Sequence, residues 1–306
     1  MDERERLAAD IKDQEWVDYF YLQMGAEEVL DRLEALSVNL TDSQDAVPFN
    51  AQVKGYFGAL DEAGHIWILK PATDPKEILY HRTCALAYLL DHWTGTLSAP
   101  TTVFRIDGKV FRATKVVPHA MQISSYDYLD QPFINVLRAD LVNRWIYFDE
   151  DRNPNNYLVI HNKGNLPFLV AIDFDKAEFS SELMKITGNP DKFGWVRGEK
   201  TRFLTLLRPD NFTNIPIEVF DARLRSFMNI PEEAIARVCR RLVEGWCNDP
   251  TDVSMRLTAN ILVRRSYVDR YFRAMFRPAC EIEKDCQDTD YSMMGASFLA
   301  MHKGKK

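Results

Sequence analysis

The chain has 306 residues, of which 46% are hydrophobic and 27% are charged. This is the composition of an ordinary globular protein, so it excludes a disordered, collagen-like or low-complexity chain as a description of the whole. The net charge of −7 at pH 7 argues against a nucleic-acid-binding protein, because DNA and RNA partners normally require a basic surface.

The first predicted part of the chain, residues 1–46, is a helical extension. Apolar residues recur at helical spacing among charged residues over Asp2–Leu36. Gly25 is expected to interrupt this pattern, so that a second helix runs over Glu27–Leu36. The polar stretch Asn39–Asp45 is expected to be a linker to the next part.

The second predicted part, residues 47–118, is a small β-rich lobe. Short apolar runs flank turns at Asp61-Glu62-Ala63-Gly64 and at Asp107-Gly108, which is typical of β-hairpins. Between the two hairpins, apolar residues return to helical spacing. The expected elements are strands over Gln52–Leu60 and His65–Lys70, a helix over Lys76–Asp91, and strands over Thr101–Ile106 and Lys109–Val117.

The third predicted part, residues 119–306, is a larger and mainly helical lobe. Pro231 followed by two glutamates is a helix start signal, because proline and acidic side chains are both favoured in a first turn. The expected elements are helices over Gln131–Tyr147 and Thr251–Phe276, and short strands over Tyr157–Ile160 and Phe168–Ile172. The chain is therefore predicted to be an α+β protein with two lobes and an N-terminal helical extension.

The N-terminal sequence and the cysteines predict the compartment. The first residues are charged and lack the apolar core of a secretory signal, and no uncharged stretch approaches the roughly 20 residues of a membrane span. The five cysteines form no C-x-x-C pair and no Cys/His group, which favours a reducing compartment and argues against a structural zinc site. We expect a cytoplasmic protein without a membrane partner.

Three short segments carry side chains suited to phosphoryl transfer. Lys70 ends a predicted strand, so its ammonium could reach a cleft and pair with ATP phosphates. In the polar loop 151–156, Asp151 could accept a proton from an attacking hydroxyl, and Asn156 could give Mg²⁺ a neutral oxygen ligand. Asp173 ends another apolar strand, where a carboxylate needs a partner or a metal, and it is the second expected Mg²⁺ ligand.

Each segment also fits an ordinary structural role when it is taken alone. Lys70 could be a surface lysine with a buried stem, the loop 151–156 a polar turn, and Asp173 a strand cap or an ion-pair partner. The three segments occur in the order and spacing of a phosphoryl-transfer site, and this joint occurrence favours the functional interpretation.

The same segments resemble those of the HipA-like atypical kinases and, more distantly, of the phosphatidylinositol kinases. Those families carry a strand ending in Lys-Pro, a D-R-H-x-x-N loop and a strand ending in Asp. The resemblance covers about residues 52–176 of this chain. The matching residues are Lys70 with Pro71, Asp151, Arg152, Asn156 and Asp173.

This resemblance implies a bilobal protein-kinase-like fold, with a small β-rich N-lobe and a larger helical C-lobe, and ATP and Mg²⁺ as cofactors. It implies that Lys70 pairs with the ATP phosphates and that Asp151 is the catalytic aspartate. Asn156 and Asp173 would hold Mg²⁺. Arg152 is expected to support catalysis by structuring the loop through a charge-assisted hydrogen bond.

Five further residues would complete the nucleotide site. Gly55 and Gly58 form a partial phosphate-covering turn, although a simple strand with two small residues gives the same pattern. Glu77 begins the next helix and is the expected partner of the lysine, at a position that the helix dipole favours for any acid. Val117 and His119 lie between the lobes, where backbone groups would contact adenine.

The leading hypothesis is an ATP- and Mg²⁺-dependent kinase that phosphorylates a Ser or Thr hydroxyl of a protein, as the resemblance implies. A lipid or small-molecule acceptor and nucleotidyl transfer are alternatives within the enzyme class. Asn153 replaces the His of D-R-H, and Asp175 stands where many protein kinases have the Gly of D-F-G. These differences support another class, a pseudokinase or nucleotide-binding interaction module. The resemblance also suggests a regulatory, antitoxin-like partner.

Overall fold

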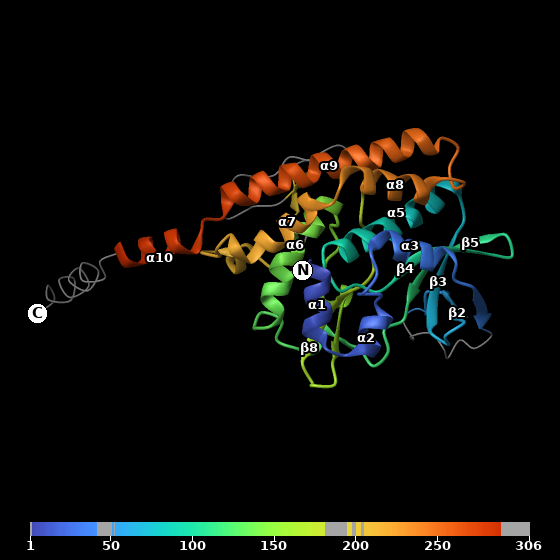
Figure 1. Ribbon diagram of the computed structural model, residues 1–306, viewed down its shortest axis with the longest axis horizontal. Helices are drawn as coiled ribbons and strands as arrows, with labels where there is room; N and C mark the ends of the chain where they lie inside the picture. The colour runs from blue at the N-terminus through green and yellow to red at the C-terminus, as the bar shows by residue number, and fades with distance from the viewer. Residues whose placement is uncertain are drawn as a thin grey trace, which may run out of the picture.

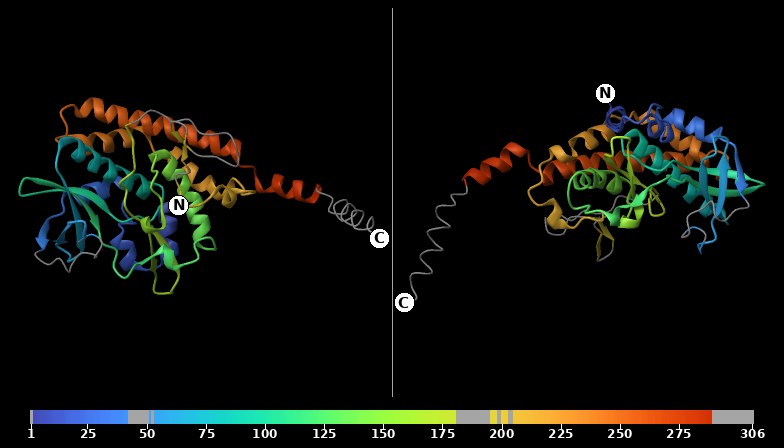
Figure 2. Two further views of the ribbon diagram at one scale, coloured as in Figure 1. Left: turned by 180° about the vertical axis from the view of Figure 1, so that it is seen from behind. Right: turned by 90° about the horizontal axis from the view of Figure 1, so that it is seen from below.

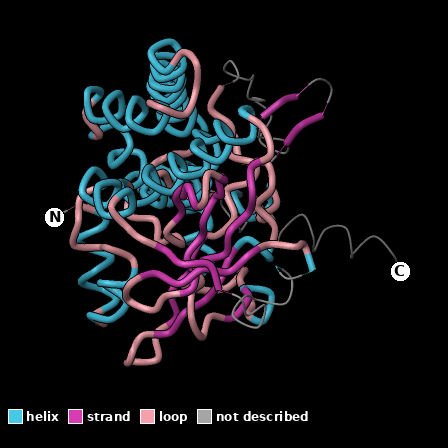
Figure 3. Tube along the Cα trace, turned by 90° about the vertical axis from the view of Figure 1, so that its right-hand side faces the viewer, coloured by secondary structure: helices cyan, strands magenta, loops and turns pink. Residues whose placement is uncertain are grey.

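The computed structural model describes residues 2–41, 51, 53–180, 195–197, 200–202 and 205–288. Within these residues the protein is a mixed α/β structure built on antiparallel sheets. The strands of the two larger sheets lie together, with the long helices above them in the view of Figure 1, and a separate two-stranded sheet lies apart from them (Figure 3).

The first sheet along the chain has five antiparallel strands in the order β1-β2-β3-β5-β4. Its strands are β1 (Val38–Thr41), β2 (Phe57–Asp61), β3 (Ile66–Ala72), β4 (Thr101–Ile106) and β5 (Lys109–Lys115). The two predicted hairpins are confirmed, although the first predicted strand is wrong before Phe57, because the chain turns at residues 54 and 55. Strand β3 pairs with β5 so that Lys70 lies opposite Arg112. The predicted linker is wrong over residues 39–41, because they pair with β2, and residues 42–45 lie outside the described part.

Helix α5 (Pro75–Trp93) packs against this sheet and confirms the helix predicted between the hairpins. It begins after Asp74, whose carboxylate accepts hydrogen bonds from two N–H groups of the first turn. Residues 81–92 are all buried, since the sheet and a later helix cover different sides of α5. A helix that is covered in this way can be apolar on every side, as the run from Cys84 to Leu90 is.

His92, near the end of α5, is expected to make the protein less stable in acid. Its Nε2 lies 2.9 Å from the backbone carbonyl oxygen of Met24, and burial lowers the pKa of His92 from 6.5 to about 4. Between these pH values the unfolded chain binds a proton that the folded protein excludes. The free energy of unfolding therefore falls as the pH falls from 6.5 towards 4.

When the pH falls from about 7 to about 4.5, we expect the free energy of unfolding of His92→Gln to decrease by about 2–3 kcal/mol less than that of the wild type. Glutamine keeps a donor for the carbonyl group but does not titrate. Urea unfolding of both proteins at the two pH values measures the difference, and equal losses would show that His92 stays protonated or becomes exposed in the folded protein.

The middle of the chain adds helix α6 (Phe133–Tyr147) and a three-stranded antiparallel sheet. The strands are β6 (Met121–Gln122), β7 (Tyr157–His161) and β8 (Pro167–Ala171). The predicted helix and hairpin are confirmed to within two residues at each end. A bridge between Ser98 and Ala171 joins β8 to the segment that precedes β4, so the two sheets are connected at this point.

The remaining described chain is mostly helical. It comprises a short hairpin, β9 (Trp195–Arg197) with β10 (Lys200–Arg202), and helices α7 (Glu218–Asn229), α8 (Glu232–Val243), α9 (Pro250–Met275) and α10 (Ala279–Asp288). Helix α9 confirms the predicted long helix, whereas Pro231 lies at the N-cap of α8 and not in its first turn. Helix α10 points away from the rest of the molecule (Figure 2). Among the described helices, none is both long and apolar enough to cross a bilayer.

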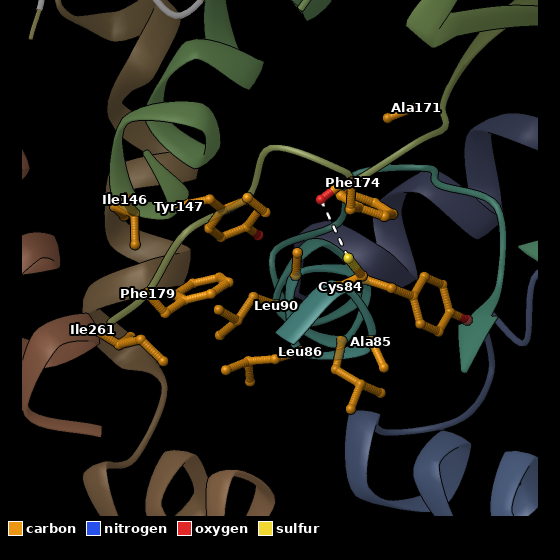
Figure 4. Close-up of a cluster of buried hydrophobic side chains, with 14 of the residues drawn as sticks. Cys84, Ala85, Leu86, Leu90, Ile146, Tyr147, Ala171, Phe174, Phe179 and Ile261 are labelled. Atoms are coloured by element: carbon orange, nitrogen blue, oxygen red, sulfur yellow. Dashed lines mark hydrogen bonds between the residues drawn. The ribbon is translucent and has the colours of Figure 1, made fainter. Parts of the chain in front are cut away.

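One hydrophobic core joins helix α5, which packs on the five-stranded sheet, to helices α6 and α9. Leu86 and Leu90 of α5, Ile146 of α6 and Ile261 of α9 are fully buried in the same cluster (Figure 4). Burial of each such side chain contributes about 1.5–3 kcal/mol. The β-rich and helical parts therefore share a core.

The N-terminal segment forms three helices, α1 (Glu3–Ile11), α2 (Gln14–Tyr19) and α3 (Ala26–Glu34). The predicted helix up to Gly25 is wrong in its middle, because Lys12 adopts a left-handed backbone conformation that ends α1. Asp13 then caps α2. Helix α2 packs near Val117 and the β7–β8 hairpin, and α3 is joined to α8 by ion pairs.

Gly95→Ala is expected to displace α1 and destabilise the protein. Gly95 has φ +73°, and a Cβ there would lie 2.5 Å from Cβ and 2.6 Å from the carbonyl carbon of Glu3. Gly64→Ala is a matched control, because Gly64 has φ +79° but open space around it. Each alanine incurs about 1–2 kcal/mol of backbone strain, and only Gly95→Ala adds a steric clash. Equal losses in urea unfolding would show that α1 moves without cost.

Candidate functional site

Strand β3 brings Lys70 to the turn that follows β8. The Lys70 ammonium donates a hydrogen bond to Oδ2 of Asp175 at 2.9 Å, although the two residues are 105 positions apart in sequence. The side chains are 28% and 24% exposed, so a ligand can reach them from solvent. The predicted lysine therefore lies at an accessible place beside an acidic group.

Arg112 is a second cation at this place, and the sequence analysis did not identify it. It lies opposite Lys70 in the β3–β5 pairing, and its guanidinium forms an ion pair with Asp175. Its side chain is only 9% exposed. The sequence signal that could have identified Arg112 is its position in the otherwise apolar run Val110–Ala113. An arginine in such a run is expected to be buried, and a buried guanidinium requires an anionic partner.

Asp173 lies at the start of the same turn. Its φ of 57° is in the left-handed region, which non-glycine residues adopt rarely and which is frequent at functional sites. Its Oδ1 accepts a hydrogen bond from the N–H of Asp175 at 3.3 Å and lies 3.8 Å from Nη2 of Arg112. Asp173 and Asp175 thus present two carboxylates to the pair of cations.

Arg152 connects the loop 151–156 to this turn, as a positioning residue. It is buried, and its Nη1 donates to the carbonyl oxygen of Ile172 at 2.8 Å while Nη2 donates to that of Asp173. Its Nε donates to Oδ2 of the buried Asp149 at 2.7 Å. The structuring hydrogen bond predicted for Arg152 is present, and Asp149, which the sequence analysis did not consider, is its acidic partner.

Asp151 is exposed at the beginning of the loop. The Asn153 amide donates to Oδ1 of Asp151 at 2.8 Å, so the residue that replaces the histidine of the motif contacts the candidate base directly. The buried Asn156 donates from Nδ2 to the backbone carbonyl oxygen of Asp151. Its own backbone oxygen accepts from the N–H of Ile172 at 3.0 Å. These bonds hold the loop beside the end of β8.

A fully buried ion network lies beneath the loop. Arg144 of α6 contacts Asp91 at 2.7 Å, Asp140 at 2.9 Å and Asp149 at 3.5 Å. Burial alone would lower the pKa of Arg144, but the carboxylates of Asp140 and Asp91 raise it well above its usual value. Arg144 therefore stays charged, and the network joins α5, α6 and the loop.

Cys84 of α5 supports the Asp173–Asp175 turn from below. Its Sγ donates a hydrogen bond to the carbonyl oxygen of Phe174 at 3.4 Å (Figure 4). Burial raises the pKa of the Cys84 thiol, although the nearby Arg112 opposes this. The Phe174 ring is buried in the core.

The predicted pairing of Lys70 with Glu77 is wrong. Glu77 is in the first turn of α5, and its carboxylate accepts hydrogen bonds from the N–H and hydroxyl of Thr73, each at 2.7 Å. These short local bonds cap the helix start and lower the pKa of Glu77. Lys70 instead takes its partner, Asp175, from the other side of the site.

The four remaining predicted residues lie in β2, in the turn before it, and in the segment 116–120 that connects β5 to β6. Gly55 has a positive φ of 71° in a turn, and Gly58 is paired within β2. Val117 is buried between the N-terminal helices and the β7–β8 hairpin, whereas His119 is exposed. No hydrogen bond or ion pair between these four residues and the Lys70–Asp175 pair is seen in the described part.

Helix α2 of the N-terminal segment contacts the beginning of the segment 116–120. The Tyr19 hydroxyl donates to the backbone oxygen of Val116, and the Lys115 ammonium lies 3.9 Å above the Tyr19 ring. Lys115 is buried, which lowers its pKa to about 8. Local sequence patterns do not predict this contact, because it joins residues that are distant in the chain.

The donor chemistry of the turn and loop fits Mg²⁺. Asp173 offers a partly exposed carboxylate, and the Asn156 amide keeps its oxygen as an acceptor because its nitrogen is the donor. Among the described residues, no group of three His, Cys, Asp or Glu side chains could hold a metal. Mg²⁺ commonly binds through one or two carboxylates together with substrate phosphates and water, so a smaller protein set is sufficient.

A cavity of about 360 Å³ lies apart from these residues, between α1, α6, α7 and β8. Its walls include Gly95, Asp140 and Arg223, and none of the predicted site residues lines it.

No protein-family model matches the chain, and no curated protein is significantly similar to it. Function is therefore inferred from the arrangement of the side chains.

Proposed function

We propose that the protein is an ATP- and Mg²⁺-dependent phosphotransferase that acts on a Ser or Thr hydroxyl of a protein. The observation that supports this best is the meeting of Lys70 with the Asp173–Asp175 turn, while Arg152 ties the Asp151 loop to the same turn. A phosphate-pairing lysine, a metal-binding aspartate and a general base are the parts that phosphoryl transfer requires.

In this proposal the fold is bilobal and similar to that of HipA-like kinases. The five-stranded sheet with α5 is the smaller lobe, and α6 to α9 with the β6–β8 sheet are the larger one. Residues 116–120 connect them, so adenine would lie near Val117 and His119. Gly55 and Gly58 would cover the phosphates from β2.

The proposed chemical step is displacement at the γ-phosphorus of ATP. The acceptor oxygen forms a bond to phosphorus, the bond to the β–γ bridging oxygen breaks, and ADP leaves with its electron pair. The exposed Asp151 carboxylate takes the acceptor proton. Lys70 stabilises the negative charge of the phosphates.

Asn156 and Asp173 are the residues that would hold Mg²⁺. When bound, the ion would neutralise charge on the β- and γ-phosphate oxygens. The protein's own part is to keep these donors in place, which it does through the backbone bond between Asn156 and Ile172 and through Arg152.

A nucleotide-binding module without turnover is the second candidate. It is favoured by the Asp175 carboxylate, which already engages the Lys70 ammonium, and by Asn153 in place of the histidine. The cytoplasmic location and an antitoxin-like partner stay predictions.

Incubation of the full chain with Mg-ATP labelled at either the γ- or the α-phosphate tests the proposal. Casein, as a Ser/Thr acceptor, and phosphatidylinositol vesicles should be offered separately, and mass spectrometry should locate any modified residue. Transfer of the γ-label to casein or to the chain itself, lost in Lys70→Met and Asp173→Asn, is the expected result.

Other outcomes identify the alternatives. Transfer of the α-label indicates nucleotidyl transfer, and label in the lipid indicates a lipid kinase. Thermal stabilisation by ATP without transfer indicates the binding module. Transfer that persists in both variants contradicts the proposed site.

A further inference from the structure

Two cations converge on one turn at the candidate site. Lys70 and Arg112 are direct neighbours across β3 and β5, and both contact the Asp175 carboxylate. Asp173, at 3.8 Å from Arg112, is the second acid. The formal charges of the two cations and the two carboxylates cancel, so the site is balanced without a ligand.

The burial of Arg112 makes a local anion necessary. Its side chain is 9% exposed, and a guanidinium stays charged at all physiological pH values. A buried charge without a partner is strongly destabilising. Arg112 has a more distant anionic partner in Asp173, at 3.8 Å. The position between Lys70 and Arg112, where one anion can neutralise both cations, is occupied in this structure by the Asp175 carboxylate.

The two acids of the turn differ in how firmly they are held. The backbone oxygen of Asp173 accepts from Arg152, which is itself anchored in the buried ion network. The hydrogen bond and ion pairs of the Asp175 side chain among the described residues are with the two cations. It lies beyond the end of β8 and outside any helix, so it can move without breaking regular structure.

We propose that Lys70 and Arg112 together form the polyphosphate-binding site, and that Asp175 is a resident anion which the phosphate chain of the ligand displaces. This inference rests on the proposed function and assigns Arg112 as a second phosphate-binding residue. The planar fork of an arginine matches phosphate oxygens in a bidentate manner, whereas the lysine acts as a point charge. The ligand class is a triphosphate chain, either of a nucleotide or inorganic.

Binding of inorganic tripolyphosphate in EDTA tests this inference without any catalysis. Isothermal titration should compare the wild type with Asp175→Asn, which removes the resident charge while keeping the shape. We expect Asp175→Asn to bind on the order of tenfold more tightly, the change that about one charge-assisted hydrogen bond represents. Arg112→Gln added to Asp175→Asn should remove that gain.

Asp130→Asn is the matched control, because Asp130 is exposed and outside the site. It changes the net charge equally and should leave the affinity unchanged. Where Asp175→Asn is less stable, its melting temperature should rise more with tripolyphosphate than that of the wild type does, since the ligand replaces the missing anion. Parallel titrations with ATP separate nucleotide recognition from recognition of the phosphate chain.

The results also separate this inference from the kinase proposal. Tighter binding by Asp175→Asn in a protein that transfers no phosphate supports the anion site and contradicts the kinase. Phosphate transfer by the wild type, with a tripolyphosphate affinity that neither Asp175→Asn nor its combination with Arg112→Gln changes, overturns the inference and leaves the kinase standing. A gain of equal size in Asp130→Asn also overturns it.

Discussion

Asp151→Asn is expected to lower kcat for γ-phosphoryl transfer by about 10²–10⁴-fold while KM for ATP stays nearly constant. Asparagine has the same shape but cannot take the acceptor proton. The Asp151 side chain is exposed and its described partner is Asn153, not the lysine that would bind phosphate. The loss should therefore appear in the chemical step and not in nucleotide binding.

Initial rates over a range of ATP concentrations measure both constants. Asn155→Ala is the control, because Asn155 is an exposed neighbour in the same loop and should retain most of the wild-type rate. A rate for Asp151→Asn within about threefold of the control would remove Asp151 from the chemistry and favour the binding module.

Arg144→Met is expected to destabilise the protein by about 3–5 kcal/mol, the effect of leaving buried charges without their partner. Arg144 is fully buried and contacts three buried carboxylates, those of Asp91, Asp140 and Asp149. Methionine fills similar space but compensates none of them. Because the loss would disturb the base of the Asp151 loop, activity should fall together with stability.

Urea unfolding near neutral pH measures this loss, with Arg225→Met as the control. Arg225 pairs with Asp221 in the same i,i+4 arrangement as Arg144 with Asp140, but its side chain is 61% exposed. Its replacement should change the free energy of unfolding by less than about 1 kcal/mol. The deficit of Arg144→Met should shrink as the pH is lowered, since the unpaired carboxylates then bind protons. Equal deficits in the two variants would contradict a structural role for the network.

Much of the element order could be predicted because secondary structure depends on nearby residues. The two hairpins around α5, the β7–β8 hairpin and the long helix α9 all follow from local apolar spacing and turn residues. The break at Lys12 was missed because a lysine in left-handed conformation has no distinctive local signal. Strand β1 was missed because its pairing with β2 crosses a long connection.

The candidate site likewise has a part that the sequence predicts and a part that it does not. The sequence by itself identified Lys70, Asp151, Arg152 and Asp173 as chemical groups, because their types and spacing match a phosphoryl-transfer pattern. Only the tertiary structure decided their partners: Asp175 in place of Glu77 for the lysine, and Arg112 beside it. Periodicity and motifs are properties of short stretches of chain. Which charges meet depends on strand register and on where a loop ends, and these are set by packing between residues that are distant in the sequence, such as Lys70 and Asp175, which are 105 positions apart.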